Sequence, residues 1–395
     1  MAKILGVKIS EIPKDQLNHE LDLFLSGSAS KFISTPNPEI ILKAIKDEEY
    51  FYILNSCDLN LADGFGLVLA GRLQGKKIPR ITGSDLTPIL LEKAQSQKLK
   101  VLIITWDKGL STATEIETGI KSKYPDLELE ILEIEKKNTL SERETIIINN
   151  FAPQLVFVTI GAPDQEKLIG HELKNWPSVK LAIGVGGSFD FLIGKIKRAP
   201  KLMRSFGLEW LWRVFSQPQQ RLKRLKRIWQ ATVVFSLKII QYNFIRPFFY
   251  RPNVVIMAYK KSAEGVKILT LEREDEPGHW QLPQGGTDGE ELKLAARREL
   301  REELGTDNFE IKFAFKNVYR YKFGEIPSNR FSGYKGQKQS LAIAEFTGED
   351  REIKINYWDH RAWRWNDTSQ LINNLHPCRQ KGAKIFLTKF NQSIK

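Results

Sequence analysis

WQLPQGGTDGEELKLAARRELREELGT, residues 280–306, is the stretch that decides the fold of the C-terminal part of the chain. Its apolar residues recur at helical spacing, which predicts an amphipathic helix over residues 288–305. Three acids, Glu299, Glu302 and Glu303, stand at positions i, i+3 and i+4 and therefore share one face of that helix. Carboxylates so close repel one another, and a hard cation such as Mg²⁺ offsets the repulsion. RRELREE taken alone also fits a surface helix held by ion pairs.

Residues on both sides of this helix favour the metal-binding interpretation. PQGG (283–286) precedes it and Gly305 follows it, and with the REL-x-EE core the segment resembles the Nudix box. The wider domain resembles the RNA pyrophosphohydrolase and dinucleoside polyphosphate hydrolase branch, because GYKGQKQ (333–339), FTGED (346–350) and WRW (363–365) recur there. The resemblance implies an α+β Nudix fold over residues 252–395 and hydrolysis of a nucleoside polyphosphate by water that Mg²⁺ activates.

The same resemblance implies roles for individual residues. The catalytic residues would be Glu299, Glu302 and Glu303, which would bind Mg²⁺ together with the carbonyl group of Gly285. The supporting residues would be Arg298, which orients the carboxylate of Glu290, and Asp359, to which the later acid of this branch maps.

The C-terminal domain departs from the family's pattern in several places, among them Ser340 and Leu341, which replace a pair that is often rich in aromatic residues. Four residues separate Gly285 from Glu290 where the box has five, Thr306 replaces an aliphatic residue, and Asp359 stands where the branch has Glu. The three helical glutamates are intact, so we expect metal binding and hydrolysis. A Nudix domain that binds nucleotide without hydrolysing it is the alternative.

Apolar runs elsewhere in the chain predict two domains. In the C-terminal part the predicted strands are NVVIMAYKK (253–261), KILTLERE (267–274), QSLAIAEFTG (339–348) and HRAWRWND (360–367). In the N-terminal part they are FYILNS (51–56), KVLIITW (100–106), QLVFVTIG (154–161) and KLAIGVGG (180–187). These last alternate with helical patterns, which favours a doubly wound, Rossmann-like α/β domain. The boundary is expected in FIRPFFYRPN (244–253), between domains over residues 1–245 and 252–395.

Polar motifs lie after or between the N-terminal strands, where an open α/β sheet places its ligands. They are STPNPEI (34–40), LADGFG (61–66), PRITGSDL (79–86), GAPDQEKLI (161–169) and GVGGSFDFLIGKIKRAP (184–200). Each alone fits an ordinary turn, and neither a Walker motif nor GxGxxG is present in the sequence. In this order, and followed by GLEWLWRVFSQPQQRLKR (207–224), they resemble the WecG/TagA/CpsF glycosyltransferases, family 26, over about residues 1–245.

This second resemblance implies inverting transfer of an N-acetylmannosamine-type sugar from a UDP donor. The acceptor would be a polyprenyl-diphosphate-linked sugar, at the cytoplasmic membrane face, in the synthesis of a cell-surface polysaccharide. No metal or other cofactor is expected in this domain, because the N-terminal sequence has no cluster of metal ligands. TWDKGLS (105–111) stands where the family usually has glycines, which leaves the identity of the donor sugar open.

An inverting transfer needs a base that takes the proton from the acceptor hydroxyl. Asp63, the acid of the ADG motif, is the candidate, and Thr35 is placed beside it in the catalytic set. The substrate-binding residues implied by the resemblance are Asn37, Arg80, Gly161, Gln165, Arg198, Arg213, Arg221 and Arg224. Arginine suits a diphosphate because its planar fork binds phosphate oxygens and keeps its charge as the leaving group becomes negative.

The positive charge of the chain is concentrated in one segment. Between Lys195 and Arg251 there are fourteen Lys or Arg residues and one acid, Glu209, and this surplus equals the +13 of the whole chain. Within it, QQRLKRLKRIW (219–229) predicts a basic amphipathic helix, and the interrupted apolar run 228–249 is suited to a membrane surface. We expect residues 200–245, the basic appendage, to dock on anionic lipid. A solvated helix followed by a buried one, or a nucleic-acid patch, are the alternatives.

Length and composition exclude several classes of protein. The 395 residues predict two or three domains, and 42% hydrophobic residues are enough for real cores. Cys57 and Cys378 lie far apart without a CxxC or a Cys/His cluster, so we expect neither a disulfide framework nor a structural zinc site. The sequence has no recognisable signal peptide and no uninterrupted apolar span, which predicts a cytoplasmic, peripheral protein.

The sequence therefore predicts a bifunctional enzyme, a UDP-dependent glycosyltransferase fused to a Nudix hydrolase. The transferase resemblance also allows a homo-oligomer in which self-association buries or exposes the basic appendage. Two rival hypotheses stay open. In one, the Nudix domain trims RNA 5′ polyphosphate ends beside a retired transferase domain. In the other, a non-catalytic Nudix domain senses nucleotide for an active transferase.

Overall fold

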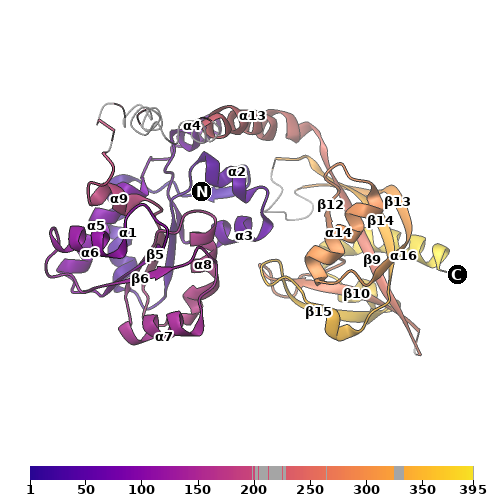
Figure 1. Cartoon of the computed structure of the whole chain (residues 1–395). Helices are drawn as coiled ribbons and strands as arrows, with labels where there is room; N and C mark the ends of the chain where they lie inside the picture. The colour runs from indigo at the N-terminus through magenta and orange to yellow at the C-terminus, as the bar shows by residue number, and fades with distance from the viewer. Residues whose placement is uncertain are drawn as a thin grey trace. The chain divides into compact units, whose positions relative to one another are not determined.

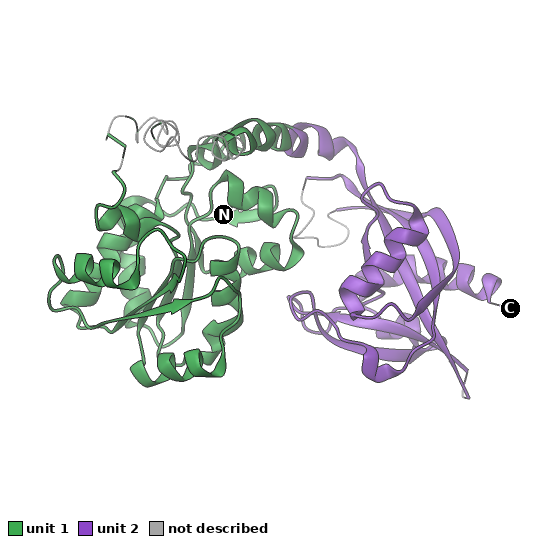
Figure 2. Ribbon diagram, viewed as in Figure 1, with its two compact units in different colours: residues 1–240 green, residues 241–395 purple. Residues whose placement is uncertain are grey.

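The chain folds into two compact units. The computed structural model describes residues 1–197, 199–200, 203, 212, 225, 228–263, 265–323 and 333–394. The units comprise residues 1–240 and 241–395 (Figure 2). Four arginines with predicted roles lie outside the described residues, as does most of the predicted basic helix: Arg198, Arg213, Arg221 and Arg224.

A six-stranded parallel sheet forms the centre of the first unit (Figure 1). Its order is β4 (Leu59–Asn60), β3 (Lys31–Ser34), β8 (Leu181–Gly184), β7 (Leu155–Val158), β5 (Val101–Trp106) and β6 (Leu129–Ile134). Separately, β1 (Ala2–Ile4) and β2 (Val7–Ile9) make an antiparallel hairpin. The predicted Rossmann-like α/β class is confirmed.

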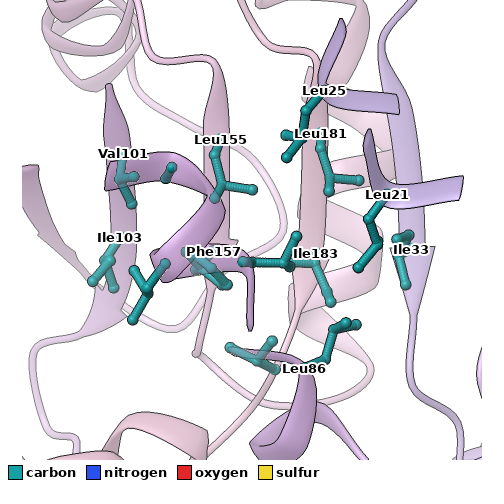
Figure 3. Close-up of a cluster of buried hydrophobic side chains, with 14 of the residues drawn as sticks. Leu21, Leu25, Ile33, Leu86, Val101, Ile103, Leu155, Phe157, Leu181 and Ile183 are labelled. Carbon is teal, nitrogen blue, oxygen red and sulfur yellow. The ribbon is translucent and has the colours of Figure 1, made fainter. Parts of the chain in front are cut away.

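Alternate residues of these strands face opposite sides of the sheet and build two cores. On one side Ile103, Phe157 and Ile183 pack with the helical residues Leu21 and Leu86 (Figure 3). On the other side the neighbouring strand residues pack with helices α3, α7 and α8. The helices are α1 (Lys14–Ser26), α2 (Pro38–Ala44), α3 (Glu48–Ser56), α4 (Phe65–Leu73), α5 (Gly83–Ser96), α6 (Ala113–Lys121), α7 (Glu142–Phe151), α8 (Asp164–Glu172), α9 (Ser188–Leu192) and α13 (Phe235–Ile240). Helices on both faces explain why the strands are almost continuously apolar.

One predicted strand, FYILNS (51–56), is wrong, because these residues belong to helix α3. The side chain of Asp47 accepts a hydrogen bond of 3.0 Å from the backbone N–H of Tyr50 and caps the helix. Tyr50, Ile53 and Leu54 then follow at helical spacing and are all buried. A short apolar run has the same composition in a buried strand and in a buried helix, so its tertiary partners decide between them.

The apolar run 228–249 is helical over Gln230–Val234, α13 and Gln241–Ile245. In the first unit Phe235 and Ile239 are buried, and this part of the helix packs on α2 and α4. On its other side Trp229 and Leu237 are 60% and 62% exposed. The run is therefore half-buried, with an apolar face left in solvent. Across the described ranges, no helix combines the length and the apolar character that crossing a membrane requires.

The second unit is the predicted α+β domain. Its sheet runs in the order β11 (Trp280–Gln281), β10 (Gly265–Arg273), β9 (Tyr250–Ser262), β14 (Gly336–Phe346) and β13 (Phe309–Lys322), while β12 (Gln284–Gly286) pairs with β9 and β15 (His360–Asp367) with β10. Its helices are α14 (Leu292–Leu304), α15 (Leu371–Asn374) and α16 (Pro377–Ser393). Apolar residues of α14 and of α16 join two different cores, on opposite faces of the sheet. Helix α14 begins four residues later than predicted, after a turn in which Asp288 and Gly289 have positive φ.

Candidate active sites

The N-terminal polar motifs meet at one edge of the parallel sheet. Strands β4, β3, β8 and β7 are neighbours, and a motif follows the carboxyl end of each. The hydroxyl of Thr35 donates to the carbonyl oxygen of Gly184 at 3.3 Å, and the backbone N–H of Asp63 donates to the carbonyl of Pro36 at 2.9 Å. The predicted catalytic residues Asp63 and Thr35 thus lie on adjoining loops.

RITGSDL lies beside the ADG motif, because Ala62 and Arg80 form a parallel backbone bridge. Helix α5 begins within this motif, at Gly83. A Cβ at Gly83 would lie 3.2 Å from the hydroxyls of both Thr35 and Ser188, so glycine is what lets three motifs approach one another. Helices α4, α5 and α8 all begin at this edge, and backbone N–H groups at helix N-termini attract anions such as a diphosphate.

In two predicted substrate-binding residues, the side-chain amide oxygen accepts hydrogen bonds from backbone N–H groups of the protein. The oxygen of Asn37 accepts from the N–H of Ile40 at 3.0 Å and caps α2. The oxygen of Gln165 accepts from the N–H groups of Gly161 at 3.2 Å and Gly186 at 3.0 Å. Gln165, which is 3% exposed, therefore ties the GAPDQE loop to the GVGG loop. Gly161, with φ of +89°, needs the freedom of glycine at this junction.

Glu166 is a buried acid that the sequence analysis did not single out. Its carboxylate accepts hydrogen bonds from the amide of Gln165 at 2.6 Å and the hydroxyl of Tyr50 at 2.9 Å. It is 0% exposed, and burial raises its pKa to about 7. Glu166 thus orients the side chain of Gln165 through this hydrogen bond. The adjacent Gln-Glu pair in GAPDQE was the available signal.

Replacing Glu166 by Gln is expected to flatten the pH dependence of stability of the first unit. Because the folded pKa of about 7 lies above the pKa of about 4.3 of an unfolded Glu, the folded state keeps a proton that the unfolded state loses. The stability contribution is full below about pH 4.3 and disappears as the pH rises through about 7, a difference of roughly 4 kcal/mol. The uncharged Gln has no such dependence.

Calorimetric melting of the wild type and Glu166→Gln between about pH 5 and 8.5 checks this expectation. Tyr50→Phe is the companion variant. It removes a hydrogen bond that favours the ionised carboxylate, so its loss of stability should extend to higher pH. Equal slopes for wild type and Glu166→Gln would contradict the assignment.

In the second unit, two carboxylates of α14 lie against strand β12, residues 284–286. The carboxylate of Glu303 accepts from the backbone N–H of Gln284 at 3.2 Å. The carboxylate of Glu299 lies over Gly285, where a Cβ would overlap it. The side chains of Glu299 and Glu303 are 8% and 6% exposed, whereas that of Glu302 is 44% exposed. The three predicted ligands and Gly285 are therefore brought together.

Gly285→Ala is expected to destabilise the second unit by about 1–3 kcal/mol, the usual cost of forcing an extra methyl group into a packed site. The new Cβ would displace the carboxylate of Glu299. Denaturant unfolding measures the effect. Glu299→Ala in the same chain removes the overlap, so the double variant should recover stability relative to the sum of the single changes. Additive losses would show that the overlap is relieved elsewhere.

Arg298 connects the acids of this site. Its guanidinium donates to Glu290 at 3.0 Å, Glu299 at 2.9 Å, Glu302 at 3.1 Å and the carbonyl of Gly286 at 2.7 Å. The predicted contact with Glu290 is therefore present.

The electrostatics of the cluster suit a divalent cation. Burial, followed by the charge of Glu303, raises the pKa of Glu299 to about 8. Burial also raises the pKa of Glu303. A hard dication close to both would favour their ionised forms, and carboxylate plus carbonyl oxygens are the ligands that Mg²⁺ takes in proteins. The donor set of Glu299, Glu302, Glu303 and Gly285 therefore fits Mg²⁺.

Three further residues complete this site, and the sequence analysis missed two of them. Asp359, which was predicted, lies next to His360, whose Nε2 is 3.3 Å from Glu303 and 3.8 Å from Asp359. His360 is fully buried, and its ligand atom lies within 4.8 Å of those of both acids. Arg251, the second residue of β9, lies beside Gly286 and interacts with Asp288 and Glu299. Arg251 was missed because it belongs to the stretch 244–253, which was interpreted as the boundary between the domains.

Comparisons with known proteins match each of the two units to a known family. The model of the "Glycosyl transferase WecG/TagA/CpsF family" matches residues 2–247, and that of the "NUDIX domain" matches residues 249–389. The N-acetylglucosaminyldiphosphoundecaprenol N-acetyl-beta-D-mannosaminyltransferase of Bacillus subtilis (strain 168) is 35% identical over 209 residues, which are 52% of this chain and 78% of that protein. The RNA pyrophosphohydrolase of Wolbachia pipientis subsp. Culex pipiens (strain wPip) is 40% identical over 152 residues, which are 37% of this chain and 92% of that protein.

A parallel sheet with polar loops at its carboxyl edge, joined to a domain with a helical glutamate cluster, defines an enzyme of two parts. The chain belongs to the WecG/TagA/CpsF glycosyltransferase family and carries a Nudix hydrolase domain after it. Both resemblances stated from the motifs are thereby confirmed.

Proposed function

We propose that the chain is a bifunctional enzyme. Its first unit transfers an N-acetylmannosamine-type sugar from a UDP donor, with inversion, to a polyprenyl-diphosphate-linked sugar for a cell-surface polysaccharide. Its second unit hydrolyses a nucleoside polyphosphate. The convergence of Asp63, Thr35 and the helix N-termini at one sheet edge is the observation that carries the transferase activity.

In the transferase site, Asp63 accepts the proton of the acceptor hydroxyl. Gln165 and Glu166 hold the two glycine loops in place, so that backbone N–H groups face the diphosphate of the donor without reorganising. The name of the Bacillus subtilis relative supports the sugar and the lipid-linked acceptor.

In the hydrolase site, Glu299, Glu302, Glu303 and Gly285 would hold Mg²⁺, which supplies an activated water and neutralises phosphate charge. Arg298 keeps the carboxylates in position, and Arg251, which lies beside Gly286, would face the phosphate. The Wolbachia relative favours one particular substrate, the 5′ polyphosphate end of RNA, as a second candidate beside free nucleotides.

The proposed location is the cytoplasmic face of the membrane, where a polyprenyl acceptor is available. Trp229, Leu237 and Ile240 expose apolar surface on the helical part of the basic appendage. Apolar side chains beside a surplus of Lys and Arg suit a peripheral helix on anionic lipid.

The decisive experiment uses the full chain in detergent with UDP-N-acetylmannosamine and a polyprenyl-diphosphate-GlcNAc analogue. Acceptor-dependent release of UDP is the expected result. In parallel, the same preparation receives a nucleoside triphosphate or a 5′-triphosphorylated RNA with Mg²⁺. RNA turnover without sugar transfer would favour a retired transferase, and transfer without any nucleotide turnover would favour a sensor.

A further inference from the structure

Two histidines and a cysteine from distant parts of the second unit lie side by side. Cys378 is in the first turn of α16, His376 is the N-cap of that helix, and His279 directly precedes β11. The Sγ atom of Cys378 lies 3.0 Å from Nδ1 of His376 and 4.0 Å from Nε2 of His279. One ligand atom from each residue lies within 4.8 Å of those of the other two. The absence of a Cys/His cluster, which was expected, is therefore wrong.

These separations fit a transition-metal ion. A tetrahedral zinc ion with Zn–N of about 2.0–2.1 Å and Zn–S of about 2.3 Å separates its nitrogen and sulfur ligands by about 3.6 Å. The two S···N distances of 3.0 and 4.0 Å lie on either side of that value. A thiolate with imidazoles favours Zn²⁺ and related ions over Mg²⁺, which takes oxygen ligands.

A carboxylate occupies the other side of both rings. Glu276 lies 2.7 Å from Nδ1 of His279 and 3.9 Å from Nε2 of His376. A carboxylate on the second nitrogen of a metal-bound histidine selects the tautomer and holds the ring. With Glu276 there, His279 presents Nε2 and His376 presents Nδ1 towards Cys378.

Three rearrangements would accompany metal binding. The first is that Nδ1 of His376 gives up the hydrogen bond of 3.4 Å that it accepts from the backbone N–H of Cys378. Arg379 donates from Nε to Nε2 of His279 at 3.2 Å and has to leave that nitrogen, and it has a second partner in Tyr321. The two imidazole rings are stacked with centroids 4.1 Å apart and planes 4° apart, so one ring has to turn before both lone pairs meet at one ion. The side chain of His376 is 29% exposed and has room to turn, whereas that of His279 is fully buried.

We propose that His279, His376 and Cys378 form a binding site for a zinc-like transition-metal ion, with Glu276 supporting the histidines and water completing the coordination. The site is separate from the carboxylate cluster of α14, since it shares no residue with it. It links the start of α16 to β11, the strand that precedes β12 and Gly285. A bound ion would therefore stabilise the second unit.

The test uses reduced, untagged full chain, stripped with chelator and kept in excess Mg²⁺ so that the carboxylate cluster is filled. Co²⁺ is the probe, because a thiolate ligand gives a sulfur-to-cobalt charge-transfer band that carboxylates cannot produce. We expect one Co²⁺ per chain with this band, displaced by Zn²⁺, and a higher melting temperature of the second unit with Zn²⁺. Cys378→Ser, a near-isosteric change, should remove the band.

Cys57→Ser is the matched control, because it removes the other cysteine, in the first unit, and should leave the band intact. His376→Ala should weaken Co²⁺ binding at least tenfold, as loss of a ligand or its support does, and it changes a part-exposed residue. A wild-type protein that shows no thiolate band, or a band that survives Cys378→Ser, would overturn the proposal. Neither result depends on sugar transfer or nucleotide hydrolysis, so the proposed function is tested separately.

Discussion

Glu302→Gln is expected to slow nucleotide hydrolysis by the chain on the order of 10²–10³-fold while leaving it folded. Metal-based stabilisation of phosphate charge contributes several kcal/mol, and each 1.36 kcal/mol corresponds to a factor of about ten in rate. Glu302 is the most exposed of the three acids, at 44%, and its hydrogen bond to Arg298 is shared with two other acids. The loss should therefore come from the metal site rather than from unfolding.

The measurement is Mg²⁺-dependent phosphate or pyrophosphate release from a nucleoside polyphosphate, with circular dichroism as the check on folding. Glu310→Gln is the matched control, since Glu310 is an exposed acid of the same unit that pairs with Lys312 at 2.6 Å and lies outside the cluster. Equal, measurable rates in wild type and Glu302→Gln would remove Glu302 from the catalytic set, whereas no release by either protein would support a nucleotide sensor.

Asp63→Asn is expected to reduce sugar transfer by about 10²–10⁴-fold, the usual contribution of a positioned general base. Asn keeps the size of the side chain and the backbone bond from residue 63 to Pro36. It loses the carboxylate that would take the acceptor proton. The loops around it are held by Gly83 and Gln165 independently of this side chain, so the fold should persist.

Acceptor-dependent UDP release reports this loss directly. Asp126→Asn is the matched control, because Asp126 is exposed and precedes β6, at the amino end of the strand and away from the proposed site. Full activity in Asp63→Asn would mean that another group takes the proton. A loss of donor binding in the same variant would move Asp63 from the catalytic set to the binding set.

The transferase motifs show which features of the site local sequence can predict. ADG, RITGSDL and GAPDQE were located correctly in the loops at a sheet edge, because a turn after a buried parallel strand is a local property. What Gln165 does could not be inferred in this way. Its oxygen bonds to Gly161 and to Gly186, and the second of these is 21 residues away. Only the packing of β7 against β8 brings the two loops together.

In the hydrolase unit, too, local sequence predicted some site residues and missed those that tertiary contacts bring in. Helical spacing alone placed Glu299, Glu302 and Glu303 on one face, since periodicity along a helix needs no tertiary partner. His360 and Arg251 were missed because they reach the cluster from separate strands, β15 and β9. Burial of the Glu299 carboxylate, which raises its pKa, likewise exists only after the sheet has formed.

By itself, the sequence determined the two domains and their fold classes, because periodicity and turn chemistry act over short distances. The motifs for both proposed reactions were recognised by their resemblance to two families. The sequence could not decide whether FYILNS is a strand or a helix, since both bury the same side chains. The grouping of Cys378 and His376 with His279, about a hundred residues earlier, was also decided only by the tertiary structure. Packing of α16 beside β11 brings these residues together across a long loop, and no local sequence pattern predicts such a contact.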